Sequence, residues 1–274
     1  MRRPFDVTLV AALVLALAFL VLPLVAIFLR IPPGDLFAQL ADPAAVDALL
    51  VSLKTNLIAQ AFILGVGTPA AYFLATRRFR GRNLVLTLIE LPLVLPPAVA
   101  GIALLAAFGS RGLLGETFEA LGFSIPFTQT AVVLAVLFVA SPFYLRQAIS
   151  AFEAVDPQLL DASRTLGARP VRTFGRVALP LAAGGLAAGA TLAFARGLGE
   201  FGATIMFAGS LQGVTQTLPL MIYAQLNLDF DVALAVGALL VLVSLVVLLS
   251  AKLVPSWRRF TSIWVFGSGR TTSS

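Results

Sequence analysis

The segment Asp161-Ala162-Ser163-Arg164-Thr165-Leu166-Gly167, followed after nine residues by Val177-Ala178-Leu179-Pro180, is a polar interruption between long apolar runs. A proline fits the first turn of a helix, and a glycine in the left-handed conformation commonly ends one. With Pro157 in front, residues 158–166 are therefore predicted to form a short helix that stops at Gly167. The surrounding arginines place it in a basic cytoplasmic loop; they are Arg164, Arg169, Arg172 and Arg176.

The composition is that of a membrane protein. Hydrophobic residues make up 59% of the 274 residues, charged residues only 12%, and the mean hydropathy is +0.98, values that a water-soluble domain would not normally show. Cysteine and histidine are both absent. Disulfide frameworks, thiolate chemistry, imidazole bases and the common zinc sites are excluded as a result.

Six apolar runs are long enough to cross a hydrocarbon core of about 30 Å. The first follows Arg2-Arg3 and resembles a signal peptide, but it would be about 33 Å long as a helix and no small-x-small cleavage site is evident. We expect it to be a retained anchor. The runs are Val7–Phe28, Thr55–Ala75, Leu84–Phe108, Thr130–Phe152, Ala178–Gly199 and Val232–Leu253.

Positive charge is distributed unequally between the connections. If the N-terminus is inside, the outside segments hold only Arg30, Lys54 and Arg111 of the 19 basic residues, whereas nearly all the others lie in cytoplasmic loops and tails. The positive-inside rule then predicts that both termini are cytoplasmic. The net charge of +6 is therefore explained by the basic cytoplasmic loops of a membrane protein. Nucleic acid is not an expected partner, because the basic residues are split among separate loops without interleaved aromatics.

The third run contains Glu90-Leu91-Pro92-Leu93-Val94-Leu95-Pro96-Pro97. Each proline removes a backbone donor, so a kinked or broken helix is expected there. Irregular backbone in a membrane is tolerated where protein or a water-filled path surrounds it. Pro96 and Pro97 are therefore candidates for lining a translocation path; the alternative is a kink that merely fits a neighbouring helix.

The fifth run carries small residues at every fourth position, namely Gly185, Gly189, Ala193 and Gly197. Such a ridge permits close approach of a partner helix. Arg196 and Glu200 are one turn apart beside it and can pair. Two interpretations stay open: a salt bridge that locks the outer end of the helix, or an Arg196 that adds positive potential to an anion path.

The polar loop resembles the pattern E-A-A-x-x-x-G-(nine)-I-x-L-P of importer permeases of the ATP-binding cassette class. Every spacing matches, while Asp161 replaces Glu, Ser163 the second Ala and Val177 Ile. The resemblance implies that this loop forms the coupling helix, which seats in a cleft of a separate ATPase subunit; the contact residues would be Asp161, Ala162, Ser163, Leu166 and Gly167. The alternative is an ordinary amphipathic loop helix.

Three further segments are similar to the molybdate and tungstate branch of that class, within a resemblance that spans about Leu84 to Tyr223. They are the proline run, Phe108-Gly109-x-Arg111-Gly112, and the polar stretch from Gly199 to Pro219. Sulfate and thiosulfate permeases are the nearest cousins. A path for a tetrahedral dianion needs hydrogen-bond donors in a mildly positive field. Candidate donors are Ser141, Thr204, Thr215, Gln216 and Thr217.

The resemblance implies an all-α polytopic membrane protein with the six-helix type I importer permease fold, located in the inner membrane. It implies alternating access, a second permease copy in a homodimer, a pair of ATPase subunits and an extracytoplasmic molybdate-binding protein. We expect one membrane domain over residues 1–274, with the coupling loop at about 153–177 and a disordered tail at about 267–274.

The chain has no G-x-x-x-x-G-K-[ST] phosphate loop, so ATP and Mg²⁺ are expected to be used by the partner ATPase, and no cofactor or metal is expected on this chain. An intramembrane protease is disfavoured, because Glu90, Glu200 and Arg196 form no evident catalytic dyad. An ion-coupled secondary transporter would leave the coupling-loop pattern without an explanation.

Overall fold

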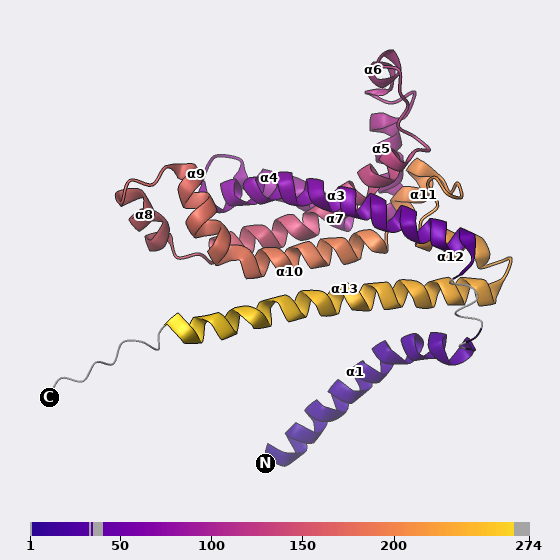
Figure 1. Cartoon of the computed structure of the whole chain (residues 1–274), viewed down its shortest axis with the longest axis horizontal. Helices are drawn as coiled ribbons and strands as arrows, with labels where there is room; N and C mark the ends of the chain where they lie inside the picture. Colours follow the sequence, from indigo (N-terminus) through magenta and orange to yellow (C-terminus); the bar gives the residue numbers. More distant parts are fainter. Residues whose placement is uncertain (1, 33, 35–40, 266–274) are drawn as a thin grey trace.

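A computed structural model of the chain describes residues 2–32, 34 and 41–265, and within them every regular element is a helix (Figure 1). The expected disordered tail at 267–274 lies outside the described residues. The longer helices are α1 (Arg2–Arg30), α3 (Pro43–Thr76), α4 (Arg82–Val94), α5 (Pro97–Phe108), α7 (Gln129–Glu153), α10 (Leu179–Leu198) and α13 (Phe230–Val265). The shorter elements are α6 (Gly115–Ala120), α8 (Pro157–Thr165), α9 (Pro170–Thr173), the π-helical turn η1 (Phe174–Ala178), α11 (Gly202–Ala208) and α12 (Leu218–Gln225).

The helices supply up to six candidate membrane spans, at the places expected. Five segments are single helices long and apolar enough to cross a bilayer, and α4 with α5 makes a sixth as a broken pair. The fifth span is longer than predicted, because α9, η1 and α10 run on as one helical segment over Pro170–Leu198. Its start at Pro170 rather than Ala178 places the Val177-Ala178-Leu179-Pro180 motif inside the helix.

The second span also begins earlier than predicted, at Pro43 instead of Thr55. Asp42 caps the helix by accepting a hydrogen bond from the Ala44 amide at 3.0 Å, and Pro43 occupies the first turn. The added turns are buried against α12 and α13. Lys54, predicted to lie in an outside connection, is therefore inside α3, where its Nζ donates to Gln129 Oε1 at 2.8 Å.

The proline run breaks the third span, as predicted. The axes of α4 and α5 differ by 116°. Leu95, which lies between the two helices and precedes Pro96, has extended backbone angles. A residue before proline is driven out of the helical region, and Pro96 supplies no amide hydrogen. The chain consequently turns sharply there, and α5 projects from the side of the bundle (Figure 1).

The core lies between α3, α7 and α10, with the first turns of α8 closing its inner end. The small residues of α10 make the close approach possible. A Cβ added at Gly185 would lie 2.5 Å from Ala151 Cβ, and one at Gly189 would lie 2.9 Å from Gln147 Cβ, so both glycines face α7. The predicted partner helix of the small-residue ridge is therefore α7.

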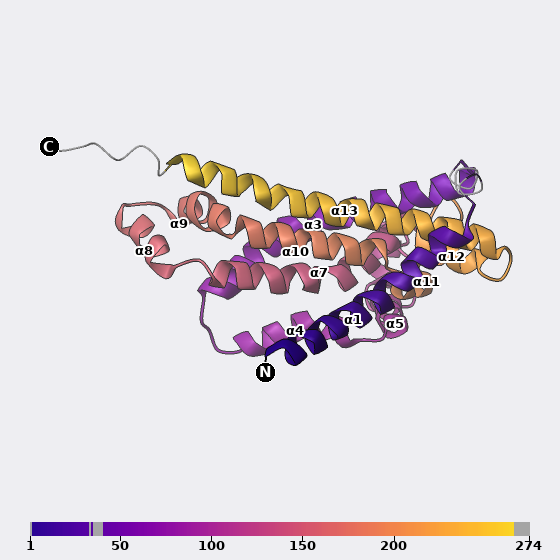
Figure 2. The same cartoon turned by 90° about the horizontal axis from the view of Figure 1, so that it is seen from below.

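Helix α1 stands apart from this bundle in Figure 1, and seen from below it crosses in front of α4 and α5 (Figure 2). None of its most apolar span window is buried within the chain. Its outer end touches α13, where Ile27 and Ile31 pack against Ala235 and Ala238. The rest of α1 needs lipid or another protein to cover it.

Candidate functional site

Helix α8 is the predicted short helix in the polar loop, and local hydrogen bonds fix both of its ends. It spans Pro157–Thr165, within one residue of the predicted 158–166. The Asp156 side chain accepts from the Gln158 amide at 2.9 Å, and Pro157 occupies the first turn. The sequence Asp-Pro therefore starts the helix by the ordinary capping chemistry.

Gly167 ends α8 in the left-handed conformation, with φ of +80°. The Ala168 amide donates to the Ser163 carbonyl at 3.1 Å, and the Gly167 amide donates to the Arg164 carbonyl at 2.9 Å. These two bonds form a Schellman motif. A Cβ at Gly167 would meet nothing within 4 Å, so the requirement for glycine is conformational and not steric.

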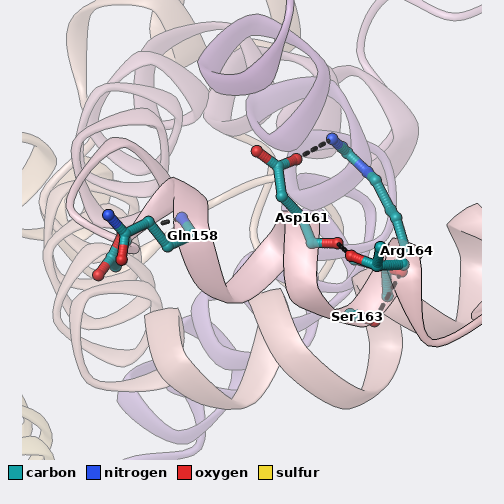
Figure 3. A network of polar contacts seen from close by, with 7 residues as sticks. Gln158, Asp161, Ser163 and Arg164 are labelled. Carbon is teal, nitrogen blue, oxygen red and sulfur yellow. Dashed lines mark hydrogen bonds and ion pairs between the residues drawn. The ribbon is translucent and has the colours of Figure 1, made fainter.

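Helix α8 presents different residues to two sides. Ala162, Ser163 and Leu166 border an apolar groove of about 600 Å³ that Val177 and Pro180 complete. Asp161 and Arg164 border a polar pocket of about 560 Å³ on the other side. Arg164 Nη1 lies 2.8 Å from Asp161 Oδ1 (Figure 3). Leu166 is 88% exposed beside this groove, so its side chain together with the groove forms one apolar surface that a partner could cover.

One side-chain contact ties α8 to the beginning of the fifth span. The Ser163 hydroxyl lies 3.0 Å from the Thr173 hydroxyl, and Thr173 is buried. The next turn, η1, is π-helical, with the Leu179 amide donating to the Phe174 carbonyl. Such turns frequently occur at functional positions in helices. A displacement of α8 would thus act directly on the segment that becomes α10.

At the other end of the bundle, Arg196 and Glu200 form the predicted ion pair. Arg196 Nη2 lies 2.7 Å from Glu200 Oε2, and the Glu200 side chain is 1% exposed against 29% for Arg196. Glu200 Oε1 accepts a second hydrogen bond, from the Ala203 amide at 2.8 Å. One carboxylate therefore joins the end of α10 to the first turn of α11. This geometry favours the locking interpretation of the pair.

The two threonines predicted for the path or outer gate lie in this region. Thr204 is in α11 and Thr217 precedes the first residue of α12 without a side-chain capping bond, and both are buried. Neither hydroxyl has a hydrogen-bond partner within the described part of the chain. Of the other predicted donors, Thr215 accepts from the Leu211 amide and Gln216 donates to Ser210 at 3.3 Å.

The remaining predicted path residues lie apart from these threonines. Pro96 and Pro97 are exposed at the break between α4 and α5. Ser141 borders a lateral pocket of about 460 Å³ between α3, α5 and α7 whose other lining residues are apolar. A single chain does not bring the predicted path residues around one cavity, and their roles stay predictions.

Two polar features of the bundle were not predicted. Ser52, Asn56 and Gln60 form a stripe along α3: Ser52 accepts from the Leu218 amide, and the two amide side chains donate to the Phe194 and Ala190 carbonyls. The sequence did contain a signal for this stripe, because polar residues recur at every fourth position of an apolar run. The second feature consists of two ion pairs between α4 and α7.

Helices α4 and α7 are joined at two levels. Arg82 Nη2 lies 2.6 Å from Glu153 Oε1, and Arg146 Nε lies 3.2 Å from Glu90 Oε1. Arg82 Nε also donates to the Leu74 carbonyl at 2.8 Å, at the end of α3. Helix α4 has no buried residue, but Val85, Leu86 and Ile89 pack against the core, and the ion pairs add to this contact.

Comparisons with known proteins point to one family. The family described as "Binding-protein-dependent transport system inner membrane component" matches residues 67–259. The molybdenum transport system permease protein ModB of Mycobacterium tuberculosis is 46% identical over 233 residues, covering 85% of this chain and 88% of that one. The sulfate transport system permease protein CysT of Escherichia coli is 32% identical over 256 residues, covering 92% of each.

Among solved structures, a bacterial transporter of the ATP-binding cassette class, involved in the import of the acidic polysaccharide alginate, superposes with a TM-score of 0.70. The sequence identity is 17%, and the superposition covers 90% of this chain and 93% of that one. At that identity the similarity establishes the fold alone.

Proposed function

The chain belongs to the binding-protein-dependent transport system inner membrane components, and from that premise we propose that it is the permease subunit of an ATP-driven importer for molybdate. The choice of molybdate as the substrate rests on the difference in sequence identity. The chain is 46% identical to the molybdenum permease and 32% identical to the sulfate permease, each over most of both chains. A multi-pass protein of this family is not an enzyme. Tungstate has the same tetrahedral geometry and charge and belongs to the same proposal.

The inner end of the bundle supports a role for α8 as the coupling helix. It is exposed, rigidly capped, and presents the apolar side chains of Ala162 and Leu166 beside a groove. ATP and Mg²⁺ would be used by a separate pair of ATPase subunits that grip this helix. Their closure would move α8 and, through Ser163 and Thr173, the fifth span.

Delivery of the oxyanion to the outer end by an extracytoplasmic binding protein belongs to the same proposal. Thr204 and Thr217 are buried there, and their hydroxyls have no hydrogen-bond partner within the described residues, so they would bind the oxyanion only after a rearrangement that exposes them. Arg196 is paired with Glu200 and would hold the outer end together during that change. A second copy of this chain would complete the path, since the exposed face of α1 and the projecting α5 are left uncovered by one chain. Alternating access then needs the α4–α5 break as a flexible joint.

The test is cellular molybdenum and tungsten content, measured by elemental mass spectrometry. A strain lacking the gene is compared with its complemented parent at trace oxyanion, with and without excess sulfate. We expect a loss of both metals that complementation restores and sulfate does not alter. Unchanged metal content with reduced sulfate uptake would move the assignment to the sulfate permeases.

Deleting the partner ATPase in the complemented strain distinguishes an ATP-driven importer from a secondary transporter. The proposal predicts that metal uptake falls to the level of the permease deletion. Uptake that persists without the ATPase would contradict an ATP-driven importer.

A further inference from the structure

The polar pocket beside α8 lies at the level where two membrane spans end. We name it the inner basic pocket and define it by Arg78, Arg82 and Arg164 with Glu153 and Asp161. Its wall includes the last turn of α3 and the last turn of α7. A site at this level is within reach of lipid headgroups.

The charges of the inner basic pocket do not balance. Glu153 pairs with Arg82 and Asp161 pairs with Arg164, so the two carboxylates are used. Arg78 makes no ion pair within the described residues and is exposed. Three guanidinium groups against two carboxylates leave one positive charge. A single anionic group is therefore the complementary ligand.

The lining of the pocket is mostly polar, with apolar side chains in its wall and beside it. Phe152 and Leu160 are buried apolar residues that form part of the pocket wall. The loop between α3 and α4 carries Phe79, whose ring lies 5.6 Å from that of Phe73, and both rings are about half exposed. Exposed rings beside arginines are the arrangement expected of a loop that rests on a membrane surface.

We propose that the inner basic pocket binds the phosphate of an anionic phospholipid, with Arg78 as the residue that selects the charge. This goes beyond the transport function. A carboxylate of the ATPase is the less favoured occupant, because most of the predicted ATPase contacts, Ala162, Ser163 and Leu166, border the apolar groove and only Asp161 borders this pocket. Since Asp161 and Arg164 belong to α8, a bound headgroup would steady the coupling helix against the bilayer.

The test uses the purified full-length chain in detergent, titrated with phosphatidylglycerol or with phosphatidylcholine of the same acyl chains, and read by native mass spectrometry. The wild type should bind phosphatidylglycerol more tightly. Arg78→Gln should weaken that binding about fivefold, the effect of one arginine near a charged surface. Arg80→Gln is the matched control: it removes the same charge from the same loop, but Arg80 does not border the pocket.

Three results would overturn the proposal. Equal losses in the two variants would mean that the loop attracts lipid by general charge and not by this pocket. Binding of inorganic phosphate as tight as that of phosphatidylglycerol, with the same dependence on Arg78, would make the ligand a free anion. Unchanged lipid binding in Arg78→Gln, together with weaker co-purification of the ATPase, would assign the pocket to a carboxylate of that subunit.

Discussion

The two ends of the helix bundle are held together in different ways. At the outer end, α5 and α11 meet through glycines: a Cβ added at Gly101 would lie 2.5 Å from Met206 Cβ, and the buried Glu200 joins α10 to α11. At the inner end, α8 is held by caps and a few polar contacts and leaves Leu166 in the open. The outer end therefore depends on packing within the chain, whereas the inner end keeps its surface for another protein.

The largest expected effect is at the packed end. Gly101→Ala places a methyl group 2.5 Å from Met206 Cβ and 2.9 Å from the Ala203 carbonyl oxygen, and overpacking of this kind costs about 1–3 kcal/mol. Thermal unfolding of the purified protein should show the loss. Gly184→Ala is the matched control, because nothing lies within 4 Å of its added Cβ. Equal stability of the two variants would contradict the tight α5–α11 contact.

The next effect concerns the buried carboxylate. Glu200→Ala removes one acceptor from Arg196 and one from the Ala203 amide, and we expect a loss of about 2 kcal/mol, since a charge-assisted hydrogen bond contributes about 1.5–3 kcal/mol. Glu116→Ala, on an exposed outer helix, should change the unfolding temperature little.

Exchanging the charges of Arg196 and Glu200 tests whether the ion pair alone explains the role of Glu200. The double variant Arg196→Glu with Glu200→Arg restores an ion pair, but an arginine cannot accept from the Ala203 amide. We therefore expect rescue of transport and stability to be incomplete. Full rescue would mean that the pair alone matters, and no rescue of transport with restored stability would favour an anion-path role for Arg196.

At the inner end, Gly167→Val forces a β-branched residue into the left-handed conformation, at a cost of about 1–2 kcal/mol that falls on the end of α8. ATP-driven uptake should drop while membrane insertion is unaffected. Gly167→Asn, which tolerates this conformation better, should keep more activity. Normal uptake in Gly167→Val would argue against a coupling role for this turn.

The smallest effect on stability and the clearest on partner binding is expected for Leu166→Ser. The side chain is already 88% exposed, so the free energy of unfolding should change by less than about 0.5 kcal/mol. Co-purification of the ATPase should nevertheless weaken. Val171→Ser, 81% exposed on α9 and outside the groove, is the control, and similar loss of ATPase with both variants would mean that α8 is not the specific contact.

Local chemistry explains what was predictable from the sequence. Asp156-Pro157 and Gly167 set the two ends of α8, and they could be recognised because capping acts over a few residues. The prolines break the third span whatever its neighbours are, because they remove backbone donors. The start of α3 was misplaced because hydropathy weighs the polar Ser52 and Lys54 against a span. In the fold Ser52 bonds to the Leu218 amide, 166 residues away, which no local pattern reveals.

The candidate site was predictable to different degrees at its two ends. The residues of α8 lie next to one another in the sequence, so the bounds of the helix followed from local capping signals. Its contact residues came only from the resemblance, and of these Asp161 borders the polar pocket and not the groove. The path residues come from separate helices, and Pro96, Ser141 and Thr204 do not share a cavity in one chain. Their arrangement depends on contacts between copies, about which one sequence carries little information.

The two ion pairs between α4 and α7 also restrict how the third span moves. Their polarity alternates: Arg82 faces Glu153, while Glu90 faces Arg146. Sliding α4 along α7 by eight residues, about 12 Å, would bring Arg82 opposite Arg146, and a shorter slide would leave all four charges unmatched. The alternation thus favours the present register over a shifted one. Because the side chains of both pairs are partly exposed, each pair contributes about 1 kcal/mol or less, so the pairs oppose sliding of α4 modestly, whereas a tilt about the break at Leu95 would leave them intact.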